Sequence, residues 1–297
     1  MKSDVLSTRQ VAQLLGVGEA TVKRWADAGE IDCFRTPGGH RKFRLRDVTA
    51  FVQKKDLHAR GPLPTGVPPG ADDLGDRASS HFEARALAGD TSALVAQLSA
   101  LRLRGHELAE IFDGLVQPAL EQVGSKWAEH KLSIAEEHIA SQSVIDCIAR
   151  CQPLAEPPGE PVRPDRGTAI VCAVSGELHD IGARMAATLL RARAFEVLAP
   201  LAQTPAKDLA EMIGRTRAAL VAIGATMVWE SDVVKDQVEM AAAAAQRVGG
   251  RMLVGGTGMQ EVQLPDGVIR CRSMTEMVAA SEQAGRKHRT RPGQPQA

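Results

Sequence analysis

The apolar positions of the first 57 residues predict two short helices separated by a tight turn. Apolar residues recur at helical spacing between positions 11 and 15, and Val22 and Trp25 give the inward face of a second helix. Residues 17–18 form the turn between them, and Gly29 ends the second helix. Two helices joined in this way are typical of a helix-turn-helix.

A basic hairpin follows between residues 35 and 46. Its tip is Pro37-Gly38-Gly39, and the segment carries five Lys and Arg side chains without one acid. Such a hairpin is suited to gripping phosphates, as the wing of a winged helix-turn-helix does. The alternative is a small helical domain with an exposed basic loop, but the order of helix, turn, helix, hairpin and helix favours DNA. The residues expected to contact double-stranded DNA are Thr21, Lys23, Arg24, Arg35, His40, Arg41, Lys42 and Arg44.

The middle of the chain shows helical periodicity between two proline-rich breaks. A polar linker over residues 58–78 precedes it, and a second break begins at Pro153. The periodicity predicts a four-helix-type bundle, of four or five helices, over residues 79–153, with runs at 82–88, 94–103, 108–115, after Pro118 and at 134–151. By spacing alone, Trp127, Glu137 and His138 would be a bundle tryptophan and a surface acid and base.

Strand and helix patterns alternate in the last part of the chain. Strand-like runs occur at 168–174, 195–198, 218–223, 251–254 and 268–271, and helical runs open near Gly182, Ala206, Ser231 and Ser273. This alternation predicts a doubly wound, Rossmann-like parallel sheet over residues 166–285, which binds ligands beyond the carboxyl ends of its strands. Residues 286–297 are expected to form a disordered tail.

Composition fits several packed domains and gives one of them a distinct charge. The chain has 297 residues, of which 44% are hydrophobic and 24% charged. Its formal net charge is zero, yet residues 1–60 hold 12 Lys and Arg against 7 Asp and Glu, so one end is basic and suited to a polyanion. Five scattered cysteines favour reduced thiols. Because neither an export signal nor a long apolar run is visible, we expect a cytoplasmic protein that does not contact the membrane.

The loop after the first strand of the sheet contains a candidate ligand site. It reads Ser-Gly-Glu177-Leu-His179-Asp-Ile-Gly182. His179 can offer one neutral ring nitrogen to a metal while Glu177 holds the other ring N–H. Gly182 would let a bulky group approach the start of the next helix. A lone histidine in a loop is usually polar surface, so its position directly after the strand is what supports the hypothesis.

This loop is similar to the Asp-x-His-x-x-Gly signature of B12-binding domains. Gly255-Gly256 matches that family's glycine pair after the fourth strand, and Thr226 stands in the register of its Ser-x-Leu motif, without the serine. The resemblance implies cobalamin as the cofactor, with His179 as the lower ligand of cobalt, ahead of another nucleotide-like ligand. A NAD-type site is less favoured because the first turn lacks Gly-x-Gly-x-x-Gly. The implied cofactor contacts in this domain are Glu177, His179, Asp180, Ile181, Gly182, Thr226, Gly255 and Gly256.

The order of modules resembles that of CarH/LitR-type B12-dependent photoreceptor regulators. Residues 11–25 and 36–43 look like the N-terminal domain of MerR-type and excisionase-like proteins, and Trp127 with Glu137-His138 resembles a Trp-x9-Glu-His motif. In that family the bundle covers the upper face of cobalamin, which assigns Trp127 to the 5′-deoxyadenosyl group and Glu137 and His138 to its polar contacts. The resemblance implies adenosylcobalamin, with methylcobalamin as an alternative. It also implies a homo-oligomer, dimer or tetramer, that binds operator DNA in the dark and releases it in the light.

One position departs from the family pattern. The best-known members use a histidine directly after the tryptophan as a new upper ligand of cobalt after illumination, and here that residue is Ala128. His130 is the candidate to replace it. On an intact helix, however, a shift of two residues turns a side chain well away from the original direction.

The sequence therefore predicts a cobalamin-binding repressor rather than an enzyme. Two alternatives stay open. One is a corrinoid-binding methyl carrier or B12 enzyme component, which would have no use for a basic DNA-binding domain. The other is a regulator that does not respond to light, either a light-independent B12 sensor or a helix-turn-helix regulator whose sensor has lost its cofactor and acts by protein contacts alone. The alanine at position 128 and the missing serine favour the loss of the cofactor, whereas Glu177, His179, Gly182 and Gly255-Gly256 oppose it.

Overall fold

The computed structural model describes residues 5–55, 57, 59, 67–68, 70–155, 163–227 and 231–286. The chain divides into two compact units, residues 1–161 and 162–297. Much of the predicted linker and nearly all of the predicted tail lie outside the described residues. All five cysteines are free thiols. Among the helices of the described residues, none is long and apolar enough to cross a membrane.

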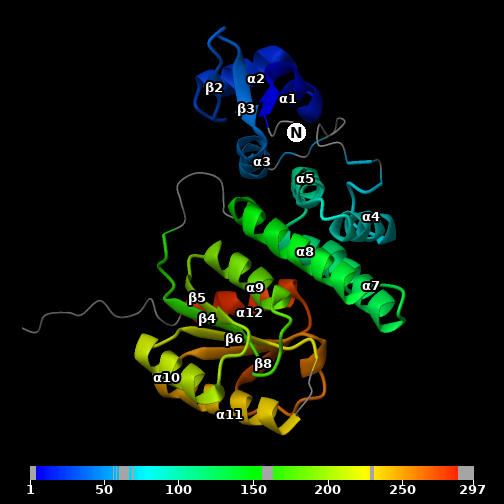
Figure 1. Ribbon diagram of the computed structural model, residues 1–297. Helices are drawn as coiled ribbons and strands as arrows, with labels where there is room; N and C mark the ends of the chain where they lie inside the picture. The colour runs from blue at the N-terminus through cyan, green and yellow to red at the C-terminus, as the bar shows by residue number, and fades with distance from the viewer. Residues whose placement is uncertain are drawn as a thin grey trace, which may run out of the picture. The chain divides into compact units, whose positions relative to one another are not determined.

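The first unit begins with a winged helix-turn-helix, as the sequence predicted (Figure 1). Its elements are β1 (Val5–Ser7), α1 (Thr8–Leu15), α2 (Glu19–Asp27), β2 (Phe34–Arg35), β3 (Arg41–Arg44) and α3 (Leu45–Lys54). The strands form an antiparallel sheet in the order β1-β3-β2. Ser7 caps α1 by accepting a hydrogen bond from the Gln10 N–H, and Gly16 ends this helix with a left-handed φ of 67°. Leu14, Val22 and Phe43 are fully buried in the core of this domain.

The wing, which we define as residues 34–44, turns tightly at its tip. The Thr36 N–H donates to the His40 carbonyl oxygen at 2.9 Å, and the Gly39 N–H donates to the Thr36 carbonyl oxygen at 2.8 Å. Gly39 has a φ of +78°, which a residue with a side chain adopts only at a cost. The glycine-rich tip therefore closes the hairpin as expected.

A helical bundle completes the first unit. Its elements are α4 (Asp76–Leu87), α5 (Thr91–Arg104), α6 (Leu108–Ile111), the π turn η1 (Phe112–Val116), α7 (Gln117–Ala128) and α8 (Ile134–Ala155). Helix α5 contacts α4 and α8 within the bundle and also α3 of the winged domain. Leu103 of α5 is fully buried in the hydrophobic core of the winged domain. The bundle and the DNA-binding domain therefore share part of one core.

The predicted break at Pro118 is not a break. Residues 108–128 form one continuous helical path, in which the Gln117 N–H donates to the Phe112 carbonyl oxygen five residues earlier. A proline ring collides with the carbonyl four residues before it in a regular α-helix. A π turn changes this spacing and lets the helix continue with Pro118 in the first turn of α7.

The end of the predicted linker packs against the bundle. Helix α4 begins at Asp76, and the side chains of Ala71 and Ala78 are fully buried. The amide of Gln97, itself fully buried, donates to the carbonyl oxygens of both alanines, at 3.0 and 2.9 Å. This buried amide holds a segment whose own composition offers little to bury.

The second unit is a doubly wound parallel sheet, which confirms the predicted fold class (Figure 1). Its elements are β4 (Thr168–Ala173), α9 (Ile181–Arg191), β5 (Glu196–Leu201), α10 (Ala206–Thr216), β6 (Leu220–Gly224), α11 (Ser231–Val248), β7 (Arg251–Gly255), the 3-10 turn η2 (Thr257–Met259), β8 (Val268–Cys271) and α12 (Met274–Arg286). The strand order is β5-β4-β6-β7-β8, with α9 and α12 on one face and α10 and α11 on the other. The order reverses between β4 and β6, where folds of this type place their ligands.

Candidate cofactor site and DNA-binding surface

Glu177 and His179 form the centre of the candidate site in the loop after β4. Glu177 Oε1 lies 2.5 Å from His179 Nδ1 and also accepts the His179 backbone N–H at 2.8 Å. Glu177 Oε2 accepts the backbone N–H groups of Thr226 and Met227, each at 2.8 Å. The buried Glu177 carboxylate therefore ties the loop after β4 to the loop after β6, across the switch point of the sheet.

The electrostatics of Glu177 fix which nitrogen of His179 is free. Burial pushes the pKa of Glu177 upward, but hydrogen bonds from Met227, His179 and Thr226 together lower it below its usual value. The group is thus a carboxylate at neutral pH, and it accepts the Nδ1–H of His179. The His179 side chain is half exposed, and its Nε2 has no hydrogen-bond partner among the described residues. A neutral imidazole oriented in this way is suited to bind a metal.

The start of α9 leaves room beside His179. A Cβ added at Gly182, in the first turn of this helix, would meet no atom within 4 Å. Asp180 is the N-cap residue, and its carboxylate accepts two hydrogen bonds from Arg184, at 2.8 and 2.6 Å. Asp180 was expected to contact the cofactor, and in this structure its side chain pairs with the arginine of its own helix. Ile181 is the first residue of α9.

The loops after β6 and β7 approach each other closely at the glycine pair. Gly256 has a φ of +94°, and a Cβ at this position would lie 2.1 Å from the Ala225 carbonyl oxygen. A Cβ at Gly255 would lie 3.1 Å from the carbonyl oxygen of Cys271. Thr226 is exposed, and its carbonyl oxygen accepts a hydrogen bond from the Thr257 hydroxyl at 2.9 Å. Only glycine permits this approach at position 256.

These residues fit a large cofactor that brings most of its own metal ligands. Among the described residues, no group of three or more His, Cys, Asp and Glu side chains could hold a metal ion. If His179 binds a metal, the remaining metal ligands would therefore come from the cofactor itself. A corrin ring provides such ligands. The side chains of Leu178, next to Glu177 in the chain, and of Met227, whose N–H donates to Glu177, are exposed and offer apolar surface to such a ring.

The predicted upper-face residues lie in the first unit, on α7 and α8. Trp127 is 44% exposed near the end of α7, and Ile134 at the start of α8 is 62% exposed. Glu137 accepts a hydrogen bond from the Ser141 hydroxyl at 2.5 Å, and His138 is exposed. Trp127 and Ile134 therefore offer exposed apolar side chains at the end of α7 and the start of α8.

His130 does not lie on a helix. Helix α7 ends at Ala128, and His130 follows with a left-handed φ of +58°. Its N–H donates to the Trp127 carbonyl oxygen at 2.9 Å, and its side chain is exposed. The direction of His130 relative to position 128 is therefore set by this turn, and the expectation for an intact helix does not apply.

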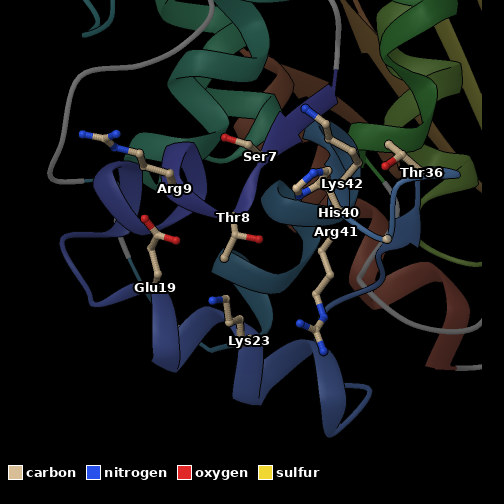
Figure 2. A pocket seen from close by; sticks show the side chains of 10 residues that line it. Ser7, Thr8, Arg9, Glu19, Lys23, Thr36, His40, Arg41 and Lys42 are labelled. Carbon is tan, nitrogen blue, oxygen red and sulfur yellow. The ribbon is translucent and has the colours of Figure 1, made fainter.

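A groove with a volume of about 520 Å³ lies between α1, α2 and the wing (Figure 2). Four of the eight predicted DNA contacts line it, namely Lys23, His40, Arg41 and Lys42. The other four lie outside it, namely Thr21, Arg24, Arg35 and Arg44. Arg41 forms an ion pair with Asp27, which fastens the wing to the end of α2. Arg44 lies over the ring of Phe34 at 5.8 Å.

Sequence reasoning missed part of this groove. The additional residues that line it are Ser7, Thr8, Arg9, Glu19, Thr36 and Gly39. Arg9 lies in the first turn of α1 and Glu19 begins α2, so both stand at helix N-termini (Figure 2). The signal that could have found them is the general geometry of the fold, because the N-terminal residues of these helices approach DNA.

Comparison with known proteins finds three family matches along the chain. A family described as a helix-turn-helix domain matches residues 5–56. Two families described as B12 binding domains match residues 81–152 and 167–272. The first of these two covers most of the helical bundle, and the second covers the sheet with the Glu177–His179 loop.

Three relatives share parts of the chain. The transcriptional repressor DcmR of Methylorubrum extorquens is 40% identical over 52 residues, which are 17% of this chain and 20% of DcmR. Dimethylamine corrinoid protein 2 of Methanosarcina acetivorans is 25% identical over 150 residues, 50% of this chain and 68% of that protein. The HTH-type transcriptional repressor CarH of Myxococcus xanthus is 26% identical over 224 residues, 68% of this chain and 72% of CarH.

The winged domain and the two B12-binding domains together define a cobalamin-binding transcription regulator. Of the three relatives, only CarH combines a match of this length with a DNA-binding function in its name. The similarity to CarH and DcmR, together with the matched domains, supports a B12-binding transcription regulator similar to CarH.

Proposed function

We propose that this regulator is a light-responsive repressor, active in the cytoplasm, that binds operator DNA as a homo-oligomer while it carries adenosylcobalamin. The observation that carries the proposal is the Glu177–His179 pair, in a chain that also has a DNA-binding domain. Glu177 holds Nδ1 of His179 and leaves Nε2 free to act as the lower ligand of cobalt. When bound, adenosylcobalamin supplies a cobalt–carbon bond that light breaks.

The residues around His179 would hold the cofactor in place. The open start of α9 at Gly182 supports the approach of a bulky ring. Thr226 follows β6, Gly255 ends β7 and Gly256 follows it, and we assign these three residues to the nucleotide tail of cobalamin. We assign the exposed Trp127 of the bundle to the 5′-deoxyadenosyl group.

The polar contacts of that group would come from Glu137 and His138 on α8. The adenosyl form is favoured over methylcobalamin because an adenosyl group offers both a flat ring for Trp127 and hydroxyl groups for these two side chains. Ser141 donates to Glu137 and so holds its carboxylate in a fixed direction.

We propose a regulator rather than a methyl carrier or enzyme component, although one relative is named a corrinoid protein. The groove of the winged domain supports this choice. It is lined by cations from two different elements, Lys23 from α2 and Lys42 from the wing, as contact with phosphates on both sides of a DNA groove requires.

The decisive experiment is an absorption spectrum of the purified chain mixed with adenosylcobalamin, desalted in the dark and recorded again after green illumination. We expect cobalamin to be retained and its spectrum to change irreversibly. His179→Ala should lose the cofactor on desalting, whereas His40→Ala, a histidine of the winged domain, should retain it. Failure of the wild-type chain to retain cobalamin would refute the cofactor assignment.

DNA release is tested on the same samples by mobility shift with a selected operator. Binding in the dark that is lost after illumination supports the light-responsive repressor. A spectral change without DNA release favours the light-independent sensor instead.

We also propose that His130 takes the upper position at cobalt in the illuminated state, in place of a histidine at position 128. This proposal is supported by the position of His130, which is exposed and lies in the turn that follows α7, close to Trp127. His130→Ala should leave the dark spectrum unchanged and alter the illuminated one, with His40→Ala, a histidine of the winged domain, as the comparison. Identical illuminated spectra for His130→Ala and the wild-type chain would contradict this role.

A further inference from the structure

The groove of the winged domain contains an acid among its cations. Glu19 is the first residue of α2, and its side chain lies in the groove near Arg9 and Lys23 (Figure 2). Glu19 is exposed, and its carboxylate forms neither a hydrogen bond nor an ion pair with another described residue. The remaining charged or ionisable residues that line the groove are Arg9, Lys23, His40, Arg41 and Lys42.

A free carboxylate in a groove that takes a polyanion is unfavourable if it meets only phosphate. It becomes favourable where it accepts a hydrogen bond from a base, and the N-terminal residues of a recognition helix are those that contact base edges. Cytosine presents its N4 amino group in the major groove, which a carboxylate accepts. Guanine presents two acceptors there, thymine presents O4, and adenine places its N7 acceptor beside its amino group, so all three oppose a carboxylate.

We propose that Glu19 determines part of the operator sequence by accepting a hydrogen bond from the N4 amino group of a cytosine. This inference rests on the proposed use of the groove for DNA. The surrounding cations would hold the phosphates, while Glu19 reads one base pair. Lys23, one turn later on the same helix, would hold the backbone beside it.

A structural role for Glu19 makes a different prediction. The N-cap of α2 is Gly18, which has no side chain to cap the helix, so an acid in the first turn stabilises the helix dipole. In that role Glu19 affects folding and overall affinity, and it is indifferent to the DNA sequence. Base preference is therefore the measurement that separates the two roles.

The test selects binding sites from a randomised pool of DNA duplexes with the full-length chain, loaded with adenosylcobalamin in the dark. The wild-type chain should enrich a cytosine at one position of each half-site, and replacing it should weaken binding roughly tenfold to hundredfold. Glu19→Ala should lose the preference at that position alone. Glu19→Gln should move it towards adenine, because an amide pairs with N6 and N7 of that base.

Asp32→Asn is the matched control, since it removes an exposed acid of the same domain that does not line the groove. It should leave every base preference unchanged. If Glu19→Ala and Glu19→Gln instead tighten binding equally to all sequences, with base preferences as in the wild-type chain, the proposal is overturned while DNA binding by this groove stands. If the wild-type chain captures no DNA in the dark or in the light, the assignment of the groove itself falls as well.

Discussion

The carboxylate of Glu177 holds the imidazole of His179 by Nδ1, at 2.5 Å, and leaves Nε2 without a hydrogen-bond partner among the described residues. The same carboxylate is anchored by backbone N–H groups of the loop after β6. The direction of the ring is thus set by two loops that follow neighbouring strands. Rotation of the imidazole would break its contact with Glu177, the residue that links these two loops.

Glu177→Gln should weaken cobalamin binding about 10- to 100-fold, the usual effect of removing a partner that orients a metal-binding histidine. A glutamine can still accept from the ring, but its amide group then faces the N–H groups of Thr226 and Met227. Titration of the chain with cobalamin in the dark measures the change. Glu196→Gln, at an exposed position of the same sheet, should bind as the wild-type chain does. Equal affinities for the Glu177 and Glu196 variants would show that the carboxylate does not orient the ring.

Gly256→Ala should destabilise the cobalamin-free chain by about 2–5 kcal/mol, since it combines a left-handed backbone with a direct collision. The new Cβ would lie 2.1 Å from the Ala225 carbonyl oxygen. Gly267→Ala separates the two effects, because Gly267 also has a positive φ, of +83°, but no atom lies within 4 Å of its Cβ position. For Gly267→Ala we expect a loss of about 1–2 kcal/mol in the free energy of unfolding, from backbone strain alone. Urea unfolding followed by circular dichroism compares them, and equal losses would contradict the collision.

The order of strands and helices in the second unit follows closely from the sequence. Its buried strands are short apolar runs, such as residues 168–173, and each is bounded by polar or glycine-rich loops. That pattern is local, so it can be recognised without knowledge of the fold. The Glu177–His179 contact could be anticipated for the same reason, because the two residues are only two positions apart.

Contacts between distant segments could not be predicted in this way. Nothing near Glu177 in the sequence indicates that the N–H of Met227 binds it. The carbonyl oxygen of Ala71, a residue before α4, accepts a hydrogen bond from Gln97 of α5, 26 positions later in the chain. Pro118 was expected to interrupt a helix, and the π turn before it depends on backbone hydrogen bonds that residue patterns do not encode. Each of these features is a tertiary effect that overrides local propensity.

Lys23→Ala and Lys42→Ala should each weaken DNA binding to all sequences. Both side chains line the groove, and each phosphate contact that is lost should lower the slope of log K against log salt by about 0.9. Lys207→Ala, on α10 of the second unit, should leave the slope unchanged. Affinity measured at several salt concentrations with one operator gives the slopes. If the slope is unchanged in both groove variants, the DNA phosphates do not contact Lys23 and Lys42.

Asp72 should contribute to stability above its pKa and cease to contribute in acid. Its carboxylate pairs with Arg104 of α5, which also donates to the Ala59 carbonyl oxygen at 2.8 Å, so the pair fastens the segment between the winged domain and the bundle. Burial acts to raise the pKa of Asp72, but the hydrogen bonds from Arg104 and the Gly70 N–H outweigh it and lower the pKa below its usual value. Because the folded-state pKa is the lower one, the stabilisation is complete above the ordinary aspartate value, near 3.9, and is lost as the pH falls through the lowered value.

A double-mutant cycle with Asp72→Asn and Arg104→Met should give a coupling of roughly 0.5–1 kcal/mol at pH 7, as for a pair still screened by water. The coupling should stay constant down to about pH 5 and then fall towards zero in stronger acid. Unfolding by urea across this pH range measures it, with Asp32→Asn to report the effect of charge alone. A coupling that persists below the pKa of Asp72 would mean that the variants act through packing of the Arg104 side chain, whose loss is independent of protonation.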